Sequence, residues 1–104
     1  MKFTTNDDVA IGVENLEKST AFYEGTLGFK PARIEPGLRV YNTGHFTLYV
    51  KEGEPHPPVP SFTVENLSHA KDHLLENGCT VLVEREHSLY FRDQDGNTWD
   101  IIEG

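Results

Sequence analysis

The sequence has little cysteine, few basic residues and no long apolar run, and each shortage narrows the kind of protein that it encodes. Cys79 is the only cysteine among 104 residues, so no disulfide can form within the chain and no multi-cysteine zinc site is possible. Because Cys79 directly follows an expected helix end, we interpret it as a small packed thiol and not as a nucleophile.

Basic residues are outnumbered by acidic ones. Nine Lys and Arg stand against seventeen Asp and Glu, which gives a formal net charge of -8. A protein that binds phosphate backbones needs a stripe of Lys and Arg, and no such stripe is visible, so we expect no nucleic-acid partner. The acidic surface is interpreted as solubilising, with attraction of a cationic ligand as the alternative.

No apolar run approaches the roughly 18 residues of a membrane span, and residues 1–6 lack the apolar stretch of a secretory signal. We therefore expect no membrane partner and a cytoplasmic location. The composition, 37% hydrophobic and 25% charged, is typical of a globular protein. The length predicts a single domain, residues 1–104, around one core.

An internal repeat organises the chain. The tetrapeptide Val-Glu-Asn-Leu occurs at residues 13–16 and again, fifty-one positions later, at residues 64–67. Each copy is preceded by an alternating apolar stretch that predicts a strand, at residues 9–13 and 60–64. The recurrence indicates that the chain arose by duplication.

A helix is expected after each copy of the tetrapeptide. The first begins at Asn15, a good N-cap, and ends before Gly28, with Leu16, Tyr23 and Leu27 at helical spacing. The second begins at residue 66 or 68 and ends at residue 78, again a glycine.

Three strands are expected after each helix, so the element order is βαβββ twice. The expected strands are residues 29–34, 38–42 and 45–50 in the first half and 80–84, 88–92 and 98–102 in the second. The modules span about residues 6–53 and 59–104. Between them lies a proline-rich joint, residues 55–60, where prolines are expected to prevent regular hydrogen bonding and to favour an extended segment.

Alternation along the strands assigns side chains to the helix-covered face or to the opposite face. If the sheet curls, the opposite face becomes a concave surface that combines small, aromatic and charged side chains, as ligand pockets do. A solvated polar face is the alternative. The candidate ligand-binding residues are Asp8, Arg39, Tyr41, His45, Thr47, Tyr49, Ser61, Ser88, Tyr90, Arg92 and Asp100.

Two stretches carry a resemblance to a known family. Residues 8–29 and residues 90–102 resemble the opening module and the closing turn and strand of the glyoxalase/bleomycin-resistance/extradiol dioxygenase (vicinal oxygen chelate) superfamily. Gln94 stands where that turn usually has proline. The resemblance implies an α+β fold in which two tandem βαβββ modules form a curved mixed sheet with a concave cavity.

The resemblance also places the metal ligands of the family's enzymes at Asp8, Tyr49, Val59 and Asp100. The repeat pairs Asp8 with Val59, and Tyr49 with Asp100, at the same spacing of fifty-one. Valine cannot bind a metal ion and neutral tyrosine is a poor ligand for the metals of this family, so we expect no metal and no cofactor.

Three functions follow from the resemblance and stay open. The first is a metal-free small-molecule binding protein like the bleomycin-resistance proteins, which take up a drug at a homodimer interface. Its ligand would be a cationic drug or antibiotic, held by Asp8 and Asp100 and stacked on Tyr49 and Tyr90, unless an arginine orients an anionic group instead.

The second function is a metal-dependent glyoxalase-like lyase or isomerase, or a transferase like the fosfomycin-resistance enzymes, since Ser88, Tyr90 and Asp100 match positions that contact substrate or metal in the family. The third is a dimeric scaffold with a vestigial cavity. A homodimer is expected in any case, because so short a chain leaves sheet surface to be covered. Whether the modules pair within one chain or exchange between two stays open.

Overall fold

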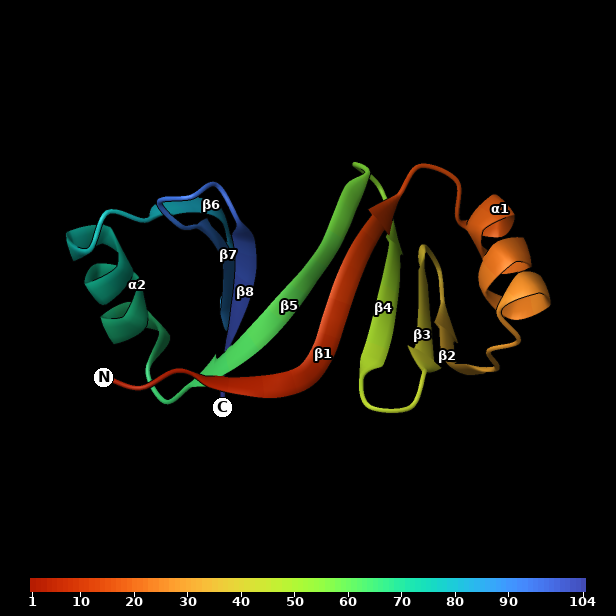
Figure 1. Ribbon diagram of the computed structural model, residues 1–104, viewed down its shortest axis with the longest axis horizontal. Helices are drawn as coiled ribbons and strands as arrows, with labels where there is room; N and C mark the ends of the chain where they lie inside the picture. The colour runs from red at the N-terminus through yellow and green to blue at the C-terminus, as the bar shows by residue number, and fades with distance from the viewer. The chain divides into compact units, whose positions relative to one another are not determined.

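A computed structural model gives the fold and describes residues 1–104 (Figure 1). The chain divides into two compact units. The first module is residues 7–58, and the second module is residues 59–104 together with residues 1–6. The amino-terminal six residues therefore pack with the carboxy-terminal half of the chain, and the boundaries of the modules differ accordingly from those expected from the repeat.

The first module is a four-stranded mixed sheet with one helical segment. Its strands lie in the order β2-β3-β4-β1, in which β1 and β4 are parallel and the other neighbours are antiparallel. The core of this module includes Leu16, Tyr41, Leu48 and Val50. The elements are β1 (Thr4–Val13), α1 (Leu16–Thr20), the π-helical turn η1 (Ala21–Thr26), β2 (Pro31–Glu35), β3 (Leu38–Asn42) and β4 (Thr47–Glu52).

The second module repeats this arrangement in the order β5-β8-β7-β6, with β5 and β8 parallel. Its core joins helix α2 to the sheet through Leu67, Ala70 and Leu74. The elements are β5 (His56–Val64), α2 (Leu67–Glu76), β6 (Thr80–Glu84), β7 (Ser88–Arg92) and β8 (Thr98–Glu103). The expected α+β fold with two βαβββ modules is confirmed. Neither helix is long and apolar enough to cross a membrane.

The proline-rich joint is not a break between strands. Strand β5 begins at His56 and runs through Pro57, Pro58 and Pro60, so the segment is extended as expected but belongs to a strand and not to a joint without regular pairing. Proline removes one donor each time, but its fixed φ near −65° is compatible with an extended chain.

The first helical segment is also less regular than expected. After α1 the chain widens into η1, where the amide of Leu27 donates to the carbonyl of Phe22, five residues back, at 3.0 Å. The wider turn rotates later side chains away from the sheet. Leu27 is 47% and Phe22 48% exposed, so Leu27 does not share the buried side of Leu16 although the sequence has the two at helical spacing.

Each helix starts at an asparagine cap. The Asn15 Oδ1 atom accepts from the amide of Lys18 at 3.0 Å, and the Asn66 Oδ1 atom accepts from the amide of His69 at 2.9 Å. Such caps satisfy amides that have no partner within the helix. The caps expected at residues 15 and 66 are confirmed.

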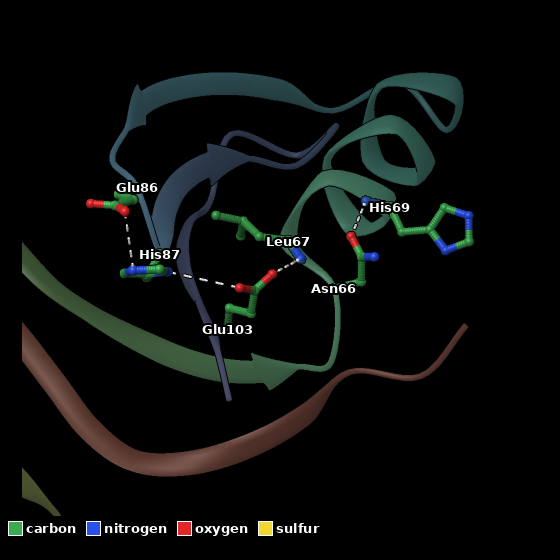
Figure 2. A network of polar contacts seen from close by, with 6 residues as sticks. All are labelled: Asn66, Leu67, His69, Glu86, His87 and Glu103. Carbon is green, nitrogen blue, oxygen red and sulfur yellow. Dashed lines mark hydrogen bonds and ion pairs between the residues drawn. The ribbon is translucent and has the colours of Figure 1, made fainter.

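A glutamate at the end of each module's last strand binds the first amide of its helix. The Oε2 atom of Glu103 accepts from the amide of Leu67 at 2.8 Å (Figure 2). Glu52 accepts in the same way from the amide of Leu16 at 2.9 Å. Glu52 and Glu103 are fifty-one residues apart, so the duplication includes this tie between helix and sheet.

The closing turn of the second module is held by Asp93. Its Oδ1 atom accepts from the amides of Asp95 and Asn97 at 3.0 and 2.9 Å, and its Oδ2 atom accepts from Trp99 Nε1 at 3.0 Å. These hydrogen bonds, first that from Trp99, lower the pKa of Asp93. Gln94, in place of the usual proline, donates from Nε2 to the carbonyl of residue 77 at the end of α2, at 2.8 Å.

The tie between helix and sheet predicts a matched loss of stability. Replacing Glu103→Ala removes a charge-assisted hydrogen bond to a helix amide, and we expect the free energy of unfolding to fall by about 1–2 kcal/mol in urea denaturation. Glu103→Gln, which keeps an acceptor, should lose less. Glu86→Ala is the control, because the Glu86 side chain is 88% exposed. An equal loss in Glu86→Ala would contradict the assignment.

Candidate functional site

The sheet of each module has one face packed on its helix and one face without a helix, which we call the open face although Val40, Ser61 and Asp100 on it are buried. In the second module Leu89, Phe91 and Ile101 pack in the core with α2. Successive side chains in a strand point to opposite faces, so Tyr90 on β7 and Asp100 on β8 lie on the open face. This face is where sequence alternation placed them.

A row of four directly opposed residues crosses the open face of the second module. It runs through Val83, Tyr90, Asp100 and Ser61, one from each strand in the order β6-β7-β8-β5. Directly opposed residues share a face and bring their Cβ atoms within about 5.5 Å. We call these four residues the second-module row.

Asp100 is a carboxylate with little exposed surface. It is 8% exposed and Ser61 is 3% exposed, and the Ser61 Oγ atom donates to Asp100 Oδ2 at 3.0 Å. The Asn6 Nδ2 atom lies 3.0 Å from both Ser61 Oγ and Thr63 Oγ1 and donates to them. A buried charge is tolerated only with hydrogen-bond partners, so this chain of donors holds the Asp100 carboxylate in place.

Tyr90 lies beside Asp100 and under an arginine. The Arg85 Cζ atom lies 5.4 Å from the centroid of the Tyr90 ring, within the range of a cation–π contact. The amide of Arg85 donates to the carbonyl of Ser88 at 2.8 Å and closes the hairpin between β6 and β7. Burial, and then the charge of Asp100, raises the pKa of Tyr90 while Arg85 lowers it, so the phenol is neutral at neutral pH.

The first module has the corresponding row, formed by Arg33, Val40, Tyr49 and Ala10 in the order β2-β3-β4-β1. Asp8 lies two residues before Ala10 on β1 and therefore on the same face. Burial, and then the charge of Asp8, raises the pKa of Tyr49, whereas Arg33 lowers it. Burial, and then Asp7, raises the pKa of Asp8.

Two predicted site residues lie on the wrong face. The row passes through Val40, so its neighbours Arg39 and Tyr41 point to the helix side, opposite Val50 and Leu48. Tyr41 is fully buried in the core. Its hydroxyl donates to Glu24 Oε2 at 2.8 Å, which satisfies the hydroxyl inside the module. Tyr41 and Arg39 are therefore corrected from open-face to helix-side residues.

The remaining predicted residues are spread along the strands. Thr47 lies opposite Asp8, and Ser88 and Arg92 lie on the same face of β7 as Tyr90. His45 is exposed in the loop before β4, because this strand begins at Thr47. The structure thus groups Asp8 with Thr47 and Tyr49 in the first module. It groups Ser61 with Asp100, Tyr90, Ser88 and Arg92 in the second.

Sequence reasoning missed Asn6, Arg33 and Arg85. The pairing of β2 with β3 shifts between Pro31 and Arg33, and such an irregularity reverses the alternation by which a side chain is assigned to a face. Arg85 lies just beyond the end of β6, where alternation carries no information. Asn6 had no local signal, since its partners are more than fifty residues away.

The positions that the family resemblance marks as metal ligands do not fit a divalent metal ion. Val59 is apolar and 2% exposed, Tyr49 is kept as a neutral phenol, and only Asp8 and Asp100 are carboxylates. No three His, Cys, Asp or Glu side chains gather where they would hold a metal ion. A catalytic metal usually needs at least three protein ligands, and this donor set supplies two.

Two four-stranded βαβββ modules with polar open faces define the class of protein. The sequence pattern of the Glyoxalase/Bleomycin resistance protein/Dioxygenase superfamily matches residues 6–101, and the chain belongs to that superfamily. Among characterised proteins it is similar to a trivalent organoarsenical cleaving enzyme from Bacillus sp. (strain MD1). The two are 28% identical over 90% of this chain and 70% of that protein.

Solved structures share the fold at low identity. A hypothetical protein from Bacillus halodurans C-125 is 15% identical, with a TM-score of 0.66 over 100% of this chain and 96% of that one. Homoprotocatechuate 2,3-dioxygenase from Brevibacterium fuscum, in complex with 3,4-dihydroxyphenylacetate, is 17% identical with a TM-score of 0.72. The match covers 98% of this chain but 37% of the dioxygenase, so the chain spans about a third of that enzyme's length.

The hydrogen bond between Ser61 and Asp100 predicts that removing a single hydroxyl group lowers the stability of the fold measurably. Ser61→Ala removes one hydroxyl from a buried carboxylate, and we expect the free energy of unfolding to fall by about 1–3 kcal/mol in urea denaturation at pH 7. The double variant Ser61→Ala/Asp100→Asn should lose less than the sum of the single variants, because the lost donor matters most to a charged acceptor. Strict additivity would refute the contact.

The buried hydroxyl of Tyr41 predicts alkaline instability. Burial, and then the hydrogen bond to Glu24, raises the pKa of Tyr41 to about 12, above its ordinary value of 10. The folded state therefore favours the protonated phenol, whose stabilising effect is complete below pH 10 and is lost as the pH rises towards 12. Urea denaturation from pH 8 to 11.5 should show a shallower decline for Tyr41→Phe than for the wild-type chain. Parallel declines would contradict the expectation.

Proposed function

We propose that this protein binds a small molecule on the open faces of its modules and that it does so without a metal ion. The observation that carries the proposal is Asp100, a carboxylate that is 8% exposed on the face away from the helix and held by Ser61. Ligand sites combine apolar surface with a few polar groups in fixed positions, and the second-module row has this composition.

A merely solvated face would be built differently. Carboxylates that serve solubility lie exposed, because removing a charge from water costs several kcal/mol unless it is compensated. Here Ser61 donates to the carboxylate, and Asn6 in turn donates to Ser61. Two further side chains are thus committed to holding one acid, which supports a binding role over the scaffold with a vestigial cavity.

The metal-free part of the proposal rests on the four positions that the family resemblance marks as metal ligands. They hold two carboxylates, a phenol and an alkyl side chain. This part of the proposal also rests on Cys79, the single thiol, which packs against the core of the second module. A bleomycin-resistance-like protein that takes up a cationic drug or antibiotic remains the proposed subtype.

A second function has one observation in its favour. The relative at 28% identity is an enzyme that cleaves trivalent organoarsenicals. An enzyme of the lyase, isomerase or transferase kind is therefore the alternative, and its site would include Ser88, Tyr90 and Asp100. We also propose a homodimer, since the edge strands β2 and β6 carry exposed apolar side chains, Ile34 at 63% and Val83 at 41%.

The test uses benzamidine, a flat cation, as the probe. In NMR titrations of the ¹⁵N-labelled chain we expect the amide signals of Ser61, Tyr90 and Asp100 to shift together. Asp100→Asn should weaken binding by about tenfold or more, since it removes the counter-charge. Asp72→Asn is the matched control, because it makes the same change at an exposed position on α2.

Metal titration separates the two functions. Manganese, nickel and zinc should each change the thermal midpoint of chain purified without a metal-affinity tag by no more than about 1–2 °C. Stabilisation by several degrees that disappears in Asp100→Asn would favour the enzyme. The absence of benzamidine shifts at the second-module row would overturn the binding of a purely cationic ligand.

A further inference from the structure

The open face of the second module sets three groups of different charge side by side. Asp100 is directly opposite Tyr90 on the neighbouring strand, and Arg85 lies over the Tyr90 ring. The order across the face is thus carboxylate, neutral ring, guanidinium. Both charges influence the phenol, the acid raising its pKa and the arginine lowering it.

The first module has an acid, a tyrosine and an arginine in the same order, but Val40 stands between Tyr49 and Arg33, and the Arg33 guanidinium pairs with Glu35. Asp8 lies on β1, Tyr49 on β4, and Arg33 on β2, where its row position is opposite Val40. Asp8 and Arg33 again act on the phenol in opposite directions. Each open face therefore has an acid towards its parallel strand pair and an arginine towards its edge strand.

The duplication does not account for this agreement. The repeat places Val59 at the position of Asp8, and Asp100 at the position of Tyr49. The row position of Tyr90 corresponds to Val40 in the first module. The same three groups thus come from positions that the repeat does not pair, which indicates that the arrangement serves a use of its own.

We infer that the ligand of the second module is a flat dipolar molecule, with a cationic or strongly donating group facing Asp100 and an anionic group facing Arg85. The inference rests on the proposed binding function and names the class of ligand. Neighbouring strands are about 4.8 Å apart, so the two charges lie about 5 to 10 Å from each other across the face. One planar ring with groups at opposite ends has that length.

The chemistry of each group supports this ligand class. A carboxylate forms its strongest hydrogen bonds with cationic donors, and a guanidinium binds carboxylate or phosphate oxygens through two parallel hydrogen bonds. Between them a neutral tyrosine ring offers apolar contact to a flat molecule. A purely cationic ligand is attracted by Asp100 but repelled by Arg85, and a purely anionic ligand is attracted by Arg85 but repelled by Asp100, so either gains less than a ligand with both charges.

The experiment compares four probes built on one benzene ring, measured by ¹⁵N NMR titration of the full chain. They are 4-amidinobenzoate, which is dipolar, benzamidine, benzoate and benzyl alcohol. We expect 4-amidinobenzoate to bind at least about tenfold more tightly than benzamidine or benzoate. Arg85→Gln should remove this advantage and leave benzamidine binding unchanged or stronger, whereas Lys2→Gln, an equal charge change at an exposed position, should preserve it.

The outcomes distinguish the ligand class from the binding function. If benzamidine binds as tightly as 4-amidinobenzoate, or if Arg85→Gln leaves the advantage intact, the dipolar ligand is overturned while small-molecule binding stands. If none of the four probes shifts the signals of the second-module row, both are overturned. Thermal denaturation of Arg85→Gln shows whether this variant is folded. If Arg85→Gln is unstable, Arg85→Lys takes its place and, because it keeps the charge, should retain part of the tighter binding of 4-amidinobenzoate.

Discussion

The carboxylate of Asp100 has to be held in a sheet with almost no contact with water, and the second module is arranged around that requirement. Ser61 stands directly opposite Asp100 on the parallel strand and donates to it. Asn6, from the far end of the sequence, donates to Ser61. This hydrogen-bond chain is one tie between the first six residues and the second module, because Asn6 supplies a donor to the Ser61 hydroxyl, which is itself buried.

The same module shows how duplication is reused and then modified. Both modules anchor their helix with a glutamate from the last strand and an asparagine cap, so these local ties were retained. Beside Glu103 the second module has His87, whose Nδ1 atom is 3.8 Å from Glu103 Oε1 (Figure 2). The corresponding position in the first module is Gly37, whose carbonyl accepts from the amide of Glu52. Because Gly37 has no side chain, this position places no group like that of His87 beside Glu52. The framework is shared, whereas the polar groups around it are particular to each module.

Local signals were sufficient for much of the fold. Asparagine caps and the glycines after each helix follow from backbone chemistry, and Gly28 and Gly78 do have positive φ, 78° and 85°. The turns of the hairpins could be found for the same reason. What could not be predicted depends on contacts distant in sequence. The prolines of β5 lie in a strand, and the π-helical turn η1 changes which side chains face the sheet.

The candidate site shows the same difference between what local sequence signals predict and what they do not. Tyr49, Tyr90, Asp8 and Asp100 were found because their strands alternate without interruption. Tyr41 and Arg39 were included among the candidate ligand-binding residues, but they lie on the helix side of a strand whose open face belongs to Val40. Arg33 and Arg85 were not predicted as site residues. Arg33 lies next to a register shift, and Arg85 lies past the end of a strand.

Without those arginines the only charged group that acts on either tyrosine is an acid, which favours a cationic ligand. With them, each tyrosine is influenced by charges of both signs, and in the second module, where Arg85 lies over the Tyr90 ring, the chemistry of the face favours a ligand that has both. The irregular backbone that hides Arg33 and Arg85 from sequence reasoning thus also determines where each arginine lies relative to its sheet.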